Sequence, residues 1–144
     1  MTTPNSPGSD DLPRPEVRAT ERAGRTPTVG GPLYHLALRS EWEEARTAGA
    51  YRRSTLGASL DEVGFIHASD ASQLHGTAAR YYGEVVDPLV VLVIEPSRLG
   101  CEVVLEAVPG GQRFPHIYGP IPLDAVVETR PARMVGGHLQ FDVT

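Results

Sequence analysis

The sequence GFIHAS, residues 64–69, is the stretch from which the rest of the chain can be understood. Its Phe-Ile pair has a high strand propensity, so the stretch predicts a short strand that ends at His67. Asp70 and Gln73 stand at the spacing of a capping box, which predicts a helix directly after the strand. A histidine between a strand end and a helix N-terminus lies where anions and phosphates bind. A lone strand histidine is more often a hydrogen-bonded structural residue, so the stretch alone leaves both interpretations open.

The composition divides the chain of 144 residues in two. Residues 1–32 hold six prolines and no aromatic residue, and their four acidic side chains balance four arginines. Such a segment buries too little apolar surface to offset its ordering entropy, so it predicts a disordered tail that folding does not need. It lacks the apolar run of a secretory signal peptide. Residues 33–144 are then expected to form a single domain, and the net charge of -5 falls on them.

The charge and the cysteine content exclude several classes of function. An acidic domain is a poor general binder of nucleic acid, and the balanced tail has only a weak long-range field. Cys101 is the only cysteine, which excludes an intrachain disulfide and a cysteine metal site. No apolar run approaches the length that spans a membrane. These features predict a cytoplasmic protein without a membrane or nucleic-acid partner.

Hydrophobic periodicity predicts an α+β fold. Strands are expected over residues 33–38, 89–94, 102–107 and 124–128, with an edge strand or loose end at 139–143. The run at 89–94 is apolar throughout, as in a strand covered on both faces. Two helices are expected, one from Ser40, with a capping box to Glu43, as far as Gly49, and one over 70–82. Residues 50–63 are expected to form a polar loop.

A second motif, RFPHIYGP at residues 113–120, changes the interpretation of His67. Its prolines restrict the backbone, so the segment predicts a stiff loop that suits a preformed ligand wall. His116 and Tyr118 point the same way if the segment is extended. Glu106 lies on the alternating strand before this motif. The simple interpretation is a half-exposed strand, and the alternative is that Glu106 presents a carboxylate near a cleft. For the motif itself, the alternative is a structural turn in which the Tyr118 hydroxyl binds a neighbouring group.

These two motifs in this order, with Trp42, Gln73 and Arg80 at their places, resemble the small bacterial family called domain of unknown function 952. The resemblance covers residues 33–130, and the tail lies outside it. In fold, that family is similar to the ADP-ribosyltransferase superfamily, whose curved, split sheet surrounds a cleft that binds NAD. The resemblance therefore implies a mixed or antiparallel split sheet with two main helices, and NAD or an ADP-ribose-like nucleotide as the ligand.

The resemblance also implies roles for particular residues. Glu106 and His67 are the implied catalytic residues, with the carboxylate stabilising the positive charge that builds on the ribose when nicotinamide leaves. The implied cofactor-binding residues are His35, Ser69, Arg80, Arg113, His116 and Tyr118. The His-Ala-Ser sequence at 67–69 is similar to an element of the RNA 2'-phosphotransferases, which also use NAD. The acceptor of any transferred group is unknown.

Two other classes of function remain open. The same residues are compatible with a non-catalytic module that binds a small molecule or nucleotide, and the tail is compatible with a protein-interaction domain. A zinc site is disfavoured because His35, His67 and His116 lie far apart in the sequence, with no helix-borne pair. The sequence predicts that these histidines, Arg113 and Tyr118 converge on one cleft. Burial and mutual repulsion are then expected to lower the histidine pKa values.

Overall fold

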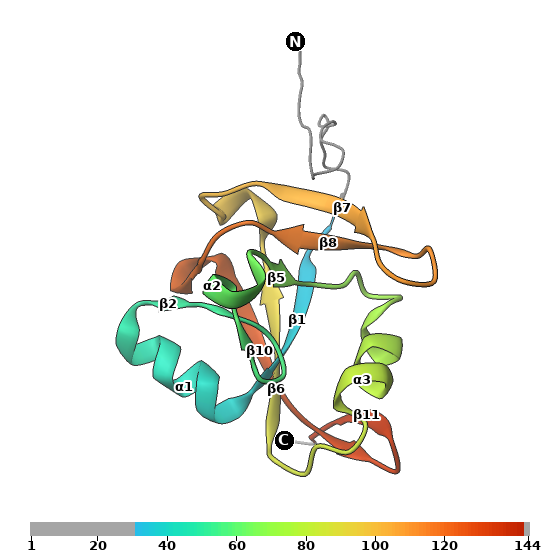
Figure 1. Ribbon diagram of the computed structural model, residues 1–144. Helices are drawn as coiled ribbons and strands as arrows, with labels where there is room; N and C mark the ends of the chain where they lie inside the picture. Colours follow the sequence, from blue (N-terminus) through green and yellow to red (C-terminus); the bar gives the residue numbers. More distant parts are fainter. Residues whose placement is uncertain (1–30, 143–144) are drawn as a thin grey trace.

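The computed structural model describes residues 31–142, and nearly all of the predicted tail, residues 1–32, lies outside this range. The described part is an α+β fold in which every strand ladder is antiparallel (Figure 1). A four-stranded sheet has the order β1 (Leu33–Leu38), β6 (Leu89–Ile94), β10 (Val126–Val135) and β11 (His138–Phe141). A three-stranded sheet has the order β5 (Ile66–His67), β8 (Arg113–Ile117) and β7 (Val103–Ala107).

The central strand β6 follows directly from its sequence. All six of its residues are apolar and buried, and β1 and β10 pair with its two edges. The alternation in β1 sorts its side chains between two cores, as predicted. Leu33 and Ala37 pack with Trp42 of α1, whereas Leu36 packs with residues of α3. The two long helices therefore cover opposite faces of the four-stranded sheet (Figure 1).

Helix α1 (Arg39–Ala48) buries Trp42 and Ala45 as predicted and ends at Gly49, whose φ is 101°. The predicted capping box from Ser40 to Glu43 is wrong, because the helix begins one residue earlier. The Arg39 N–H instead donates to the Pro88 carbonyl at 2.9 Å, so the connection before β6 supplies a partner for the free helix end.

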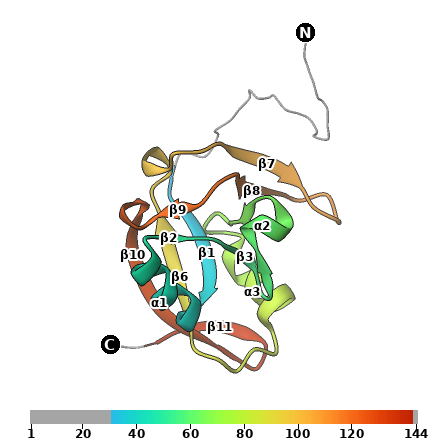
Figure 2. The ribbon, with the colours of Figure 1, turned by 60° about the vertical axis from the view of Figure 1, so that its left-hand side comes forward.

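Residues 50–63 do not form the predicted loop. This segment contains β2 (Ala50–Tyr51), β3 (Arg53–Thr55), β4 (Ala58–Ser59) and the short helix α2 (Leu60–Val63). A capping box joins Ser59 and Glu62 in both directions. Strand β2 pairs with the distant β9 (Ile121–Pro122) (Figure 2). Strand β3 pairs with β4. Strands of two or three residues are too short to show a period, which is why the sequence did not reveal them.

Helix α3 spans Leu74–Tyr82 and begins later than the predicted Asp70. The predicted reciprocal pair still forms in the preceding turn, where Asp70 and Gln73 each accept a backbone hydrogen bond from the other at 3.0 Å. Tyr82 is buried, and its hydroxyl donates to the Leu36 carbonyl at 3.2 Å. Tyr81 is exposed and lies near His67 of the second sheet, with ring centroids 6.0 Å apart.

Residues 113–117 form β8, the central strand of the second sheet, in place of the predicted stiff loop. Pro115 is tolerated because of its orientation. Its carbonyl accepts from the Ala68 N–H at 2.9 Å, so its nitrogen also faces the side where β5 ends, and no hydrogen bond to β7 is lost. Short 3-10 helices cover Pro96–Arg98 and Leu123–Ala125, so the strand predicted at 124–128 begins at Val126. Among the helices of residues 31–142, none is long and apolar enough to cross a membrane.

Candidate functional site

The residues after β5 join the two sheets and bring three histidines onto neighbouring strands. His67 pairs with His116 of β8, and two residues later Ser69 exchanges two backbone hydrogen bonds with Tyr34 of β1, both at 2.8 Å. His35 follows Tyr34 in β1. The stretch at 64–69 therefore positions the site by linking β8 to β1.

His35 is fully engaged inside the protein. Its Nδ1 lies 2.7 Å from the His67 carbonyl, and its Nε2 lies 3.0 Å from the Tyr51 hydroxyl. Because a carbonyl only accepts, Nδ1 carries the hydrogen and the Tyr51 hydroxyl donates to Nε2 of the neutral ring. Burial lowers the His35 pKa to about 4, against the opposing effect of the bond to the carbonyl. Both ring nitrogens are used, so His35 holds the fold together and has none left for a ligand.

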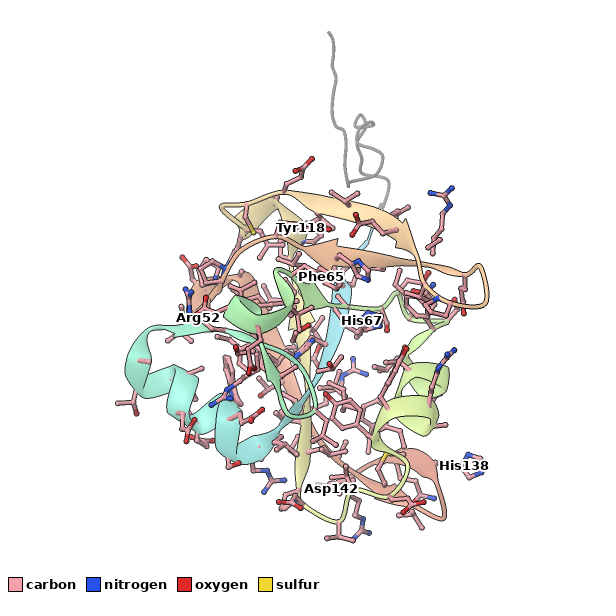
Figure 3. All side chains as sticks on the ribbon, viewed as in Figure 1. Arg52, Phe65, His67, Tyr118, His138 and Asp142 are labelled. Carbon is pink, nitrogen blue, oxygen red and sulfur yellow. The ribbon has the colours of Figure 1, made fainter. Side chains whose placement is uncertain are left out.

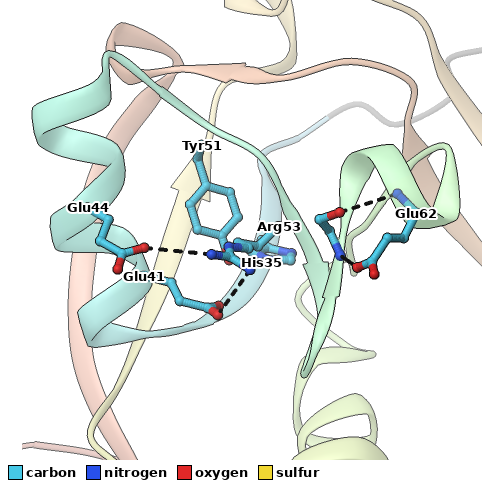
Figure 4. A network of polar contacts seen from close by, with 7 residues as sticks. His35, Glu41, Glu44, Tyr51, Arg53 and Glu62 are labelled. Atoms are coloured by element: carbon cyan, nitrogen blue, oxygen red, sulfur yellow. Dashed lines mark hydrogen bonds and ion pairs between the residues drawn. The ribbon is translucent and has the colours of Figure 1, made fainter.

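A charged network lies next to this buried pair. Arg53 reaches Glu41 and Glu44 of α1, with nitrogen–oxygen distances of 3.7 Å, in front of Tyr51 and His35 (Figure 4). The neighbouring Arg52 forms an ion pair with Asp61 at 2.9 Å on the surface. The arginines tie α1, β3 and α2 together.

His67, His116, Glu106 and Tyr118 form a continuous chain of side-chain hydrogen bonds. His67 Nδ1 lies 3.3 Å from His116 Nε2, and His116 Nδ1 lies 2.7 Å from Glu106 Oε1. The Tyr118 hydroxyl donates to the same carboxylate oxygen at 2.5 Å. His116 and Tyr118 thus point the same way, as predicted, and Glu106 presents its carboxylate on that face of the sheet.

Aromatic rings enclose this chain. The Phe65 ring stacks on His116 with centroids 4.0 Å apart and planes 13° apart. His67 lies 4.8 Å from the Phe114 ring and 6.0 Å from the Tyr81 ring, measured between centroids. Figure 3 shows Phe65 beside Tyr118, and His67 on the side of β5 that faces α3. The imidazoles are held in fixed planes by these contacts.

His67 Nε2 has an unusual position. The side chain is 93% buried (7% exposed), and no hydrogen-bond partner for this nitrogen exists among residues 31–142. Burial is the main cause that lowers the His67 pKa to about 4, and His116 and His35 add electrostatic repulsion. Buried polar atoms are nearly always paired, so this nitrogen is a candidate position for a group from outside residues 31–142, such as a water molecule, an ion or a ligand.

The other predicted site residues lie around this chain rather than in it. The Ser69 hydroxyl lies 3.0 Å from the Thr77 hydroxyl, which fastens α3 to the strand junction. Arg80 is exposed, with its guanidinium 5.5 Å from the centre of the Tyr81 ring. Side chains alternate along β8, so the Arg113 side chain projects from the face opposite His116. The Arg113 carbonyl accepts a hydrogen bond from Gln73 Nε2 at 2.6 Å.

The sequence did not reveal Phe65, Phe114 and Ser54 as neighbours of the histidines. Ser54 accepts from the backbone N–H of His67 at 3.3 Å. A signal for the meeting of Glu106 with His116 does exist in the sequence, because Gly110 and Gly111 predict a hairpin turn. That turn pairs Glu106 with Phe114, which places the carboxylate on the face of β8 that carries His116. In the described part of the chain, no group of three or more His, Cys, Asp or Glu side chains could hold a metal ion.

The sequence around the site matches one known protein family. The sequence profile of a family described as "Protein of unknown function (DUF952)" matches residues 36–129. The chain belongs to the DUF952 family. The match includes every member of the hydrogen-bonded chain from His67 to Tyr118. Among curated proteins, none matches this DUF952 chain.

Solved structures similar to this DUF952 protein come from Caulobacter crescentus. The crystal structure of its protein CC0527 is 32% identical, with a TM-score of 0.66, over 76% of this chain and 93% of that chain. A crystal structure of a CC0527 double mutant is 31% identical, with the same TM-score and coverage. The solution structure of CC0527 is 30% identical, with a TM-score of 0.61, over 75% of this chain and 90% of that chain. These similarities support the α+β architecture described above.

Proposed function

We propose that this DUF952 protein binds a ribose-containing nucleotide of the NAD or ADP-ribose class, with a polar group of the ligand on His67 Nε2. The observation that carries the proposal is the buried ring nitrogen of His67, which lacks a partner within residues 31–142. Leaving a buried polar atom unpaired costs about 1–3 kcal/mol, so a ligand that satisfies it gains binding free energy.

The surroundings of His67 fit a nucleotide in two respects. Tyr81 is the exposed ring next to His67, at 38% exposure, and it offers an aromatic surface against which a base or sugar can pack. Arg80 lies against the same ring and is exposed, so its guanidinium is available to a phosphate. The resemblance to NAD-binding proteins selects the nucleotide class among ligands with these features.

Binding without turnover is favoured over ADP-ribosyl transfer. The Glu106 carboxylate accepts hydrogen bonds from Tyr118 and His116, at 2.5 and 2.7 Å, and this engagement opposes a direct role beside a ribosyl cation. Transfer remains the second candidate, since Glu106 is only half-buried and lies on the same face as the histidines. Release of nicotinamide from NAD by the wild-type chain, lost in Glu106→Gln, decides in favour of transfer.

The binding proposal is tested by calorimetric titration of the full chain with NAD and with ADP-ribose. Heat of binding is expected with at least one of them, and His67→Ala is expected to abolish it. His138→Ala is the matched control, because His138 is exposed on β11 outside the site, and it should bind as the wild type does. No heat with either nucleotide at millimolar concentration removes the proposal.

A further inference from the structure

The hydrogen bonds that join His67, His116 and Glu106 have a defined donor-to-acceptor direction, because the Glu106 carboxylate can only accept a hydrogen bond. An ionised carboxylate has no hydrogen to donate. Its Oε1 already accepts from the Tyr118 hydroxyl, and it faces His116 Nδ1 at 2.7 Å. His116 Nδ1 must therefore carry a hydrogen. When the imidazole is neutral, the other nitrogen, His116 Nε2, then has a lone pair.

The same argument, that one partner of each contact must donate, applies to the His67 ring. His116 Nε2 faces His67 Nδ1 at 3.3 Å, and two lone pairs at this contact would repel. His67 Nδ1 therefore carries the hydrogen and donates to His116. One hydrogen on a neutral imidazole leaves the remaining nitrogen as an acceptor. That nitrogen is His67 Nε2, the atom without a partner among the described residues.

We infer that Glu106 is a positioning residue that acts through His116 to make His67 Nε2 a hydrogen-bond acceptor, so that the site takes a hydroxyl or N–H donor of its ligand and rejects a phosphate there. The ligand class rests on the proposed function, whereas the state of His67 does not. A phosphate oxygen is itself an acceptor and would meet the His67 lone pair. A sugar hydroxyl donates, so the ribose, not the pyrophosphate, of a nucleotide belongs at His67.

The aromatic contacts keep the chain aligned. Phe65 stacked on His116 holds the imidazole plane in which both of its nitrogens lie, and Phe114 and Tyr81 bound the His67 ring. A ring flip at His116 would break the contacts with Glu106 and His67 together. The hydrogen-bond pattern is therefore coupled across the three residues, and a change at Glu106 is transmitted to His67 Nε2 without direct contact.

The inference is tested without any ligand by histidine-selective 15N–1H correlation spectra of the full chain at pH 8, where imidazoles are ordinarily neutral. The wild type is expected to show His67 and His116 both protonated on Nδ1. Finding His67 protonated on Nε2 overturns the inference. If His67 shows the expected state but no nucleotide binds, the proposed function is wrong and the inference about His67 stands.

Two substitutions at Glu106 test its part. Glu106→Gln keeps an acceptor oxygen for His116 and Tyr118, so it should retain the wild-type spectrum. Glu106→Leu removes the acceptor, so the Nε2-protonated form of His67 should appear, and binding of ADP-ribose should weaken about tenfold, the equivalent of one hydrogen bond. If His67 stays protonated on Nδ1 in Glu106→Leu, Glu106 does not set its state. Should the leucine variant fail to fold, the wild-type and glutamine spectra still decide, because a change in the glutamine spectrum also contradicts the inference.

Discussion

Acidification should destabilise the fold through His35, and the size of the effect follows from its pKa. Folding lowers this pKa from 6.5 to about 4, mainly through burial. The unfolded chain therefore binds the proton more readily than the folded chain. The stabilising effect of the neutral ring is complete above pH 6.5 and is lost as the pH falls toward 4. Between pH 7.5 and pH 5, His35 alone should lower the free energy of unfolding by about 2 kcal/mol.

Urea unfolding at the two pH values measures this effect, with the fluorescence of Trp42 as the signal, since it is buried and is the only tryptophan. His35→Gln removes the titrating ring, and an amide can still donate to the His67 carbonyl. On acidification, the free energy of unfolding of this variant should fall by about 2 kcal/mol less than that of the wild type. Both proteins keep a further loss from His67, whose pKa is also lowered. His75→Gln, at an exposed position of α3, is the control and should lose as much as the wild type. Equal losses in His35→Gln and the wild type would show that His35 does not cause the acid sensitivity.

Three further predictions concern packing and are checked by urea unfolding at pH 7.5. Gly119→Ala should lower the free energy of unfolding by about 1–3 kcal/mol, because its Cβ would lie 2.7 Å from the Cβ of Cys101; no loss would show that this contact yields freely. Gly76→Ala should instead raise it by up to about 1 kcal/mol, since nothing lies within 4 Å and the residue is inside α3; a loss would contradict the open environment. Tyr82→Phe should cost about 1 kcal/mol through the lost bond to the Leu36 carbonyl, and an unchanged midpoint would mean that this bond contributes nothing.

The parts of the fold that could be predicted are the helices and strands long enough for their hydrophobic pattern to repeat. The alternation of β1 and the continuous apolar run of β6 were sufficient to place both strands and the faces of β1. Helix α1 was recognisable from Trp42, Ala45 and its terminal glycine, but not its first residue. A cap supplied by Pro88, which is distant in sequence, leaves no local pattern.

The errors arose where distant pairing outweighs local propensity. Strand β2 exists because β9 pairs with it some 70 residues later, and Pro115 enters a central strand because the neighbouring β5 ends beside it. The prolines of residues 113–120 favoured a loop, and only the sheet pairing reverses that preference. Local sequence patterns contain no information on either partner.

Four candidate residues selected from the sequence lie in contact with one another, whereas the contacts themselves could not be predicted. His67, His116, Tyr118 and Glu106 were all selected from the sequence, and the structure joins them in one hydrogen-bonded chain. Within residues 31–142, a hydrogen bond to the His67 carbonyl links His35 to those side chains, whereas the Arg113 carbonyl binds Gln73, which is not one of them. Which ring nitrogen of a histidine forms a hydrogen bond depends on partners from both sheets, and the spacing of residues in the sequence does not reveal those partners.

Binding at His67 is measured directly by a titration of the 15N-labelled full chain with ADP-ribose, followed through the histidine ring nitrogens. The resonance of His67 Nε2 is expected to shift as this nitrogen accepts a hydrogen bond, while both His35 nitrogens keep their resonance positions because they are already bonded to the His67 carbonyl and Tyr51. Binding of ADP-ribose that leaves His67 Nε2 unshifted would contradict the proposed role of this nitrogen.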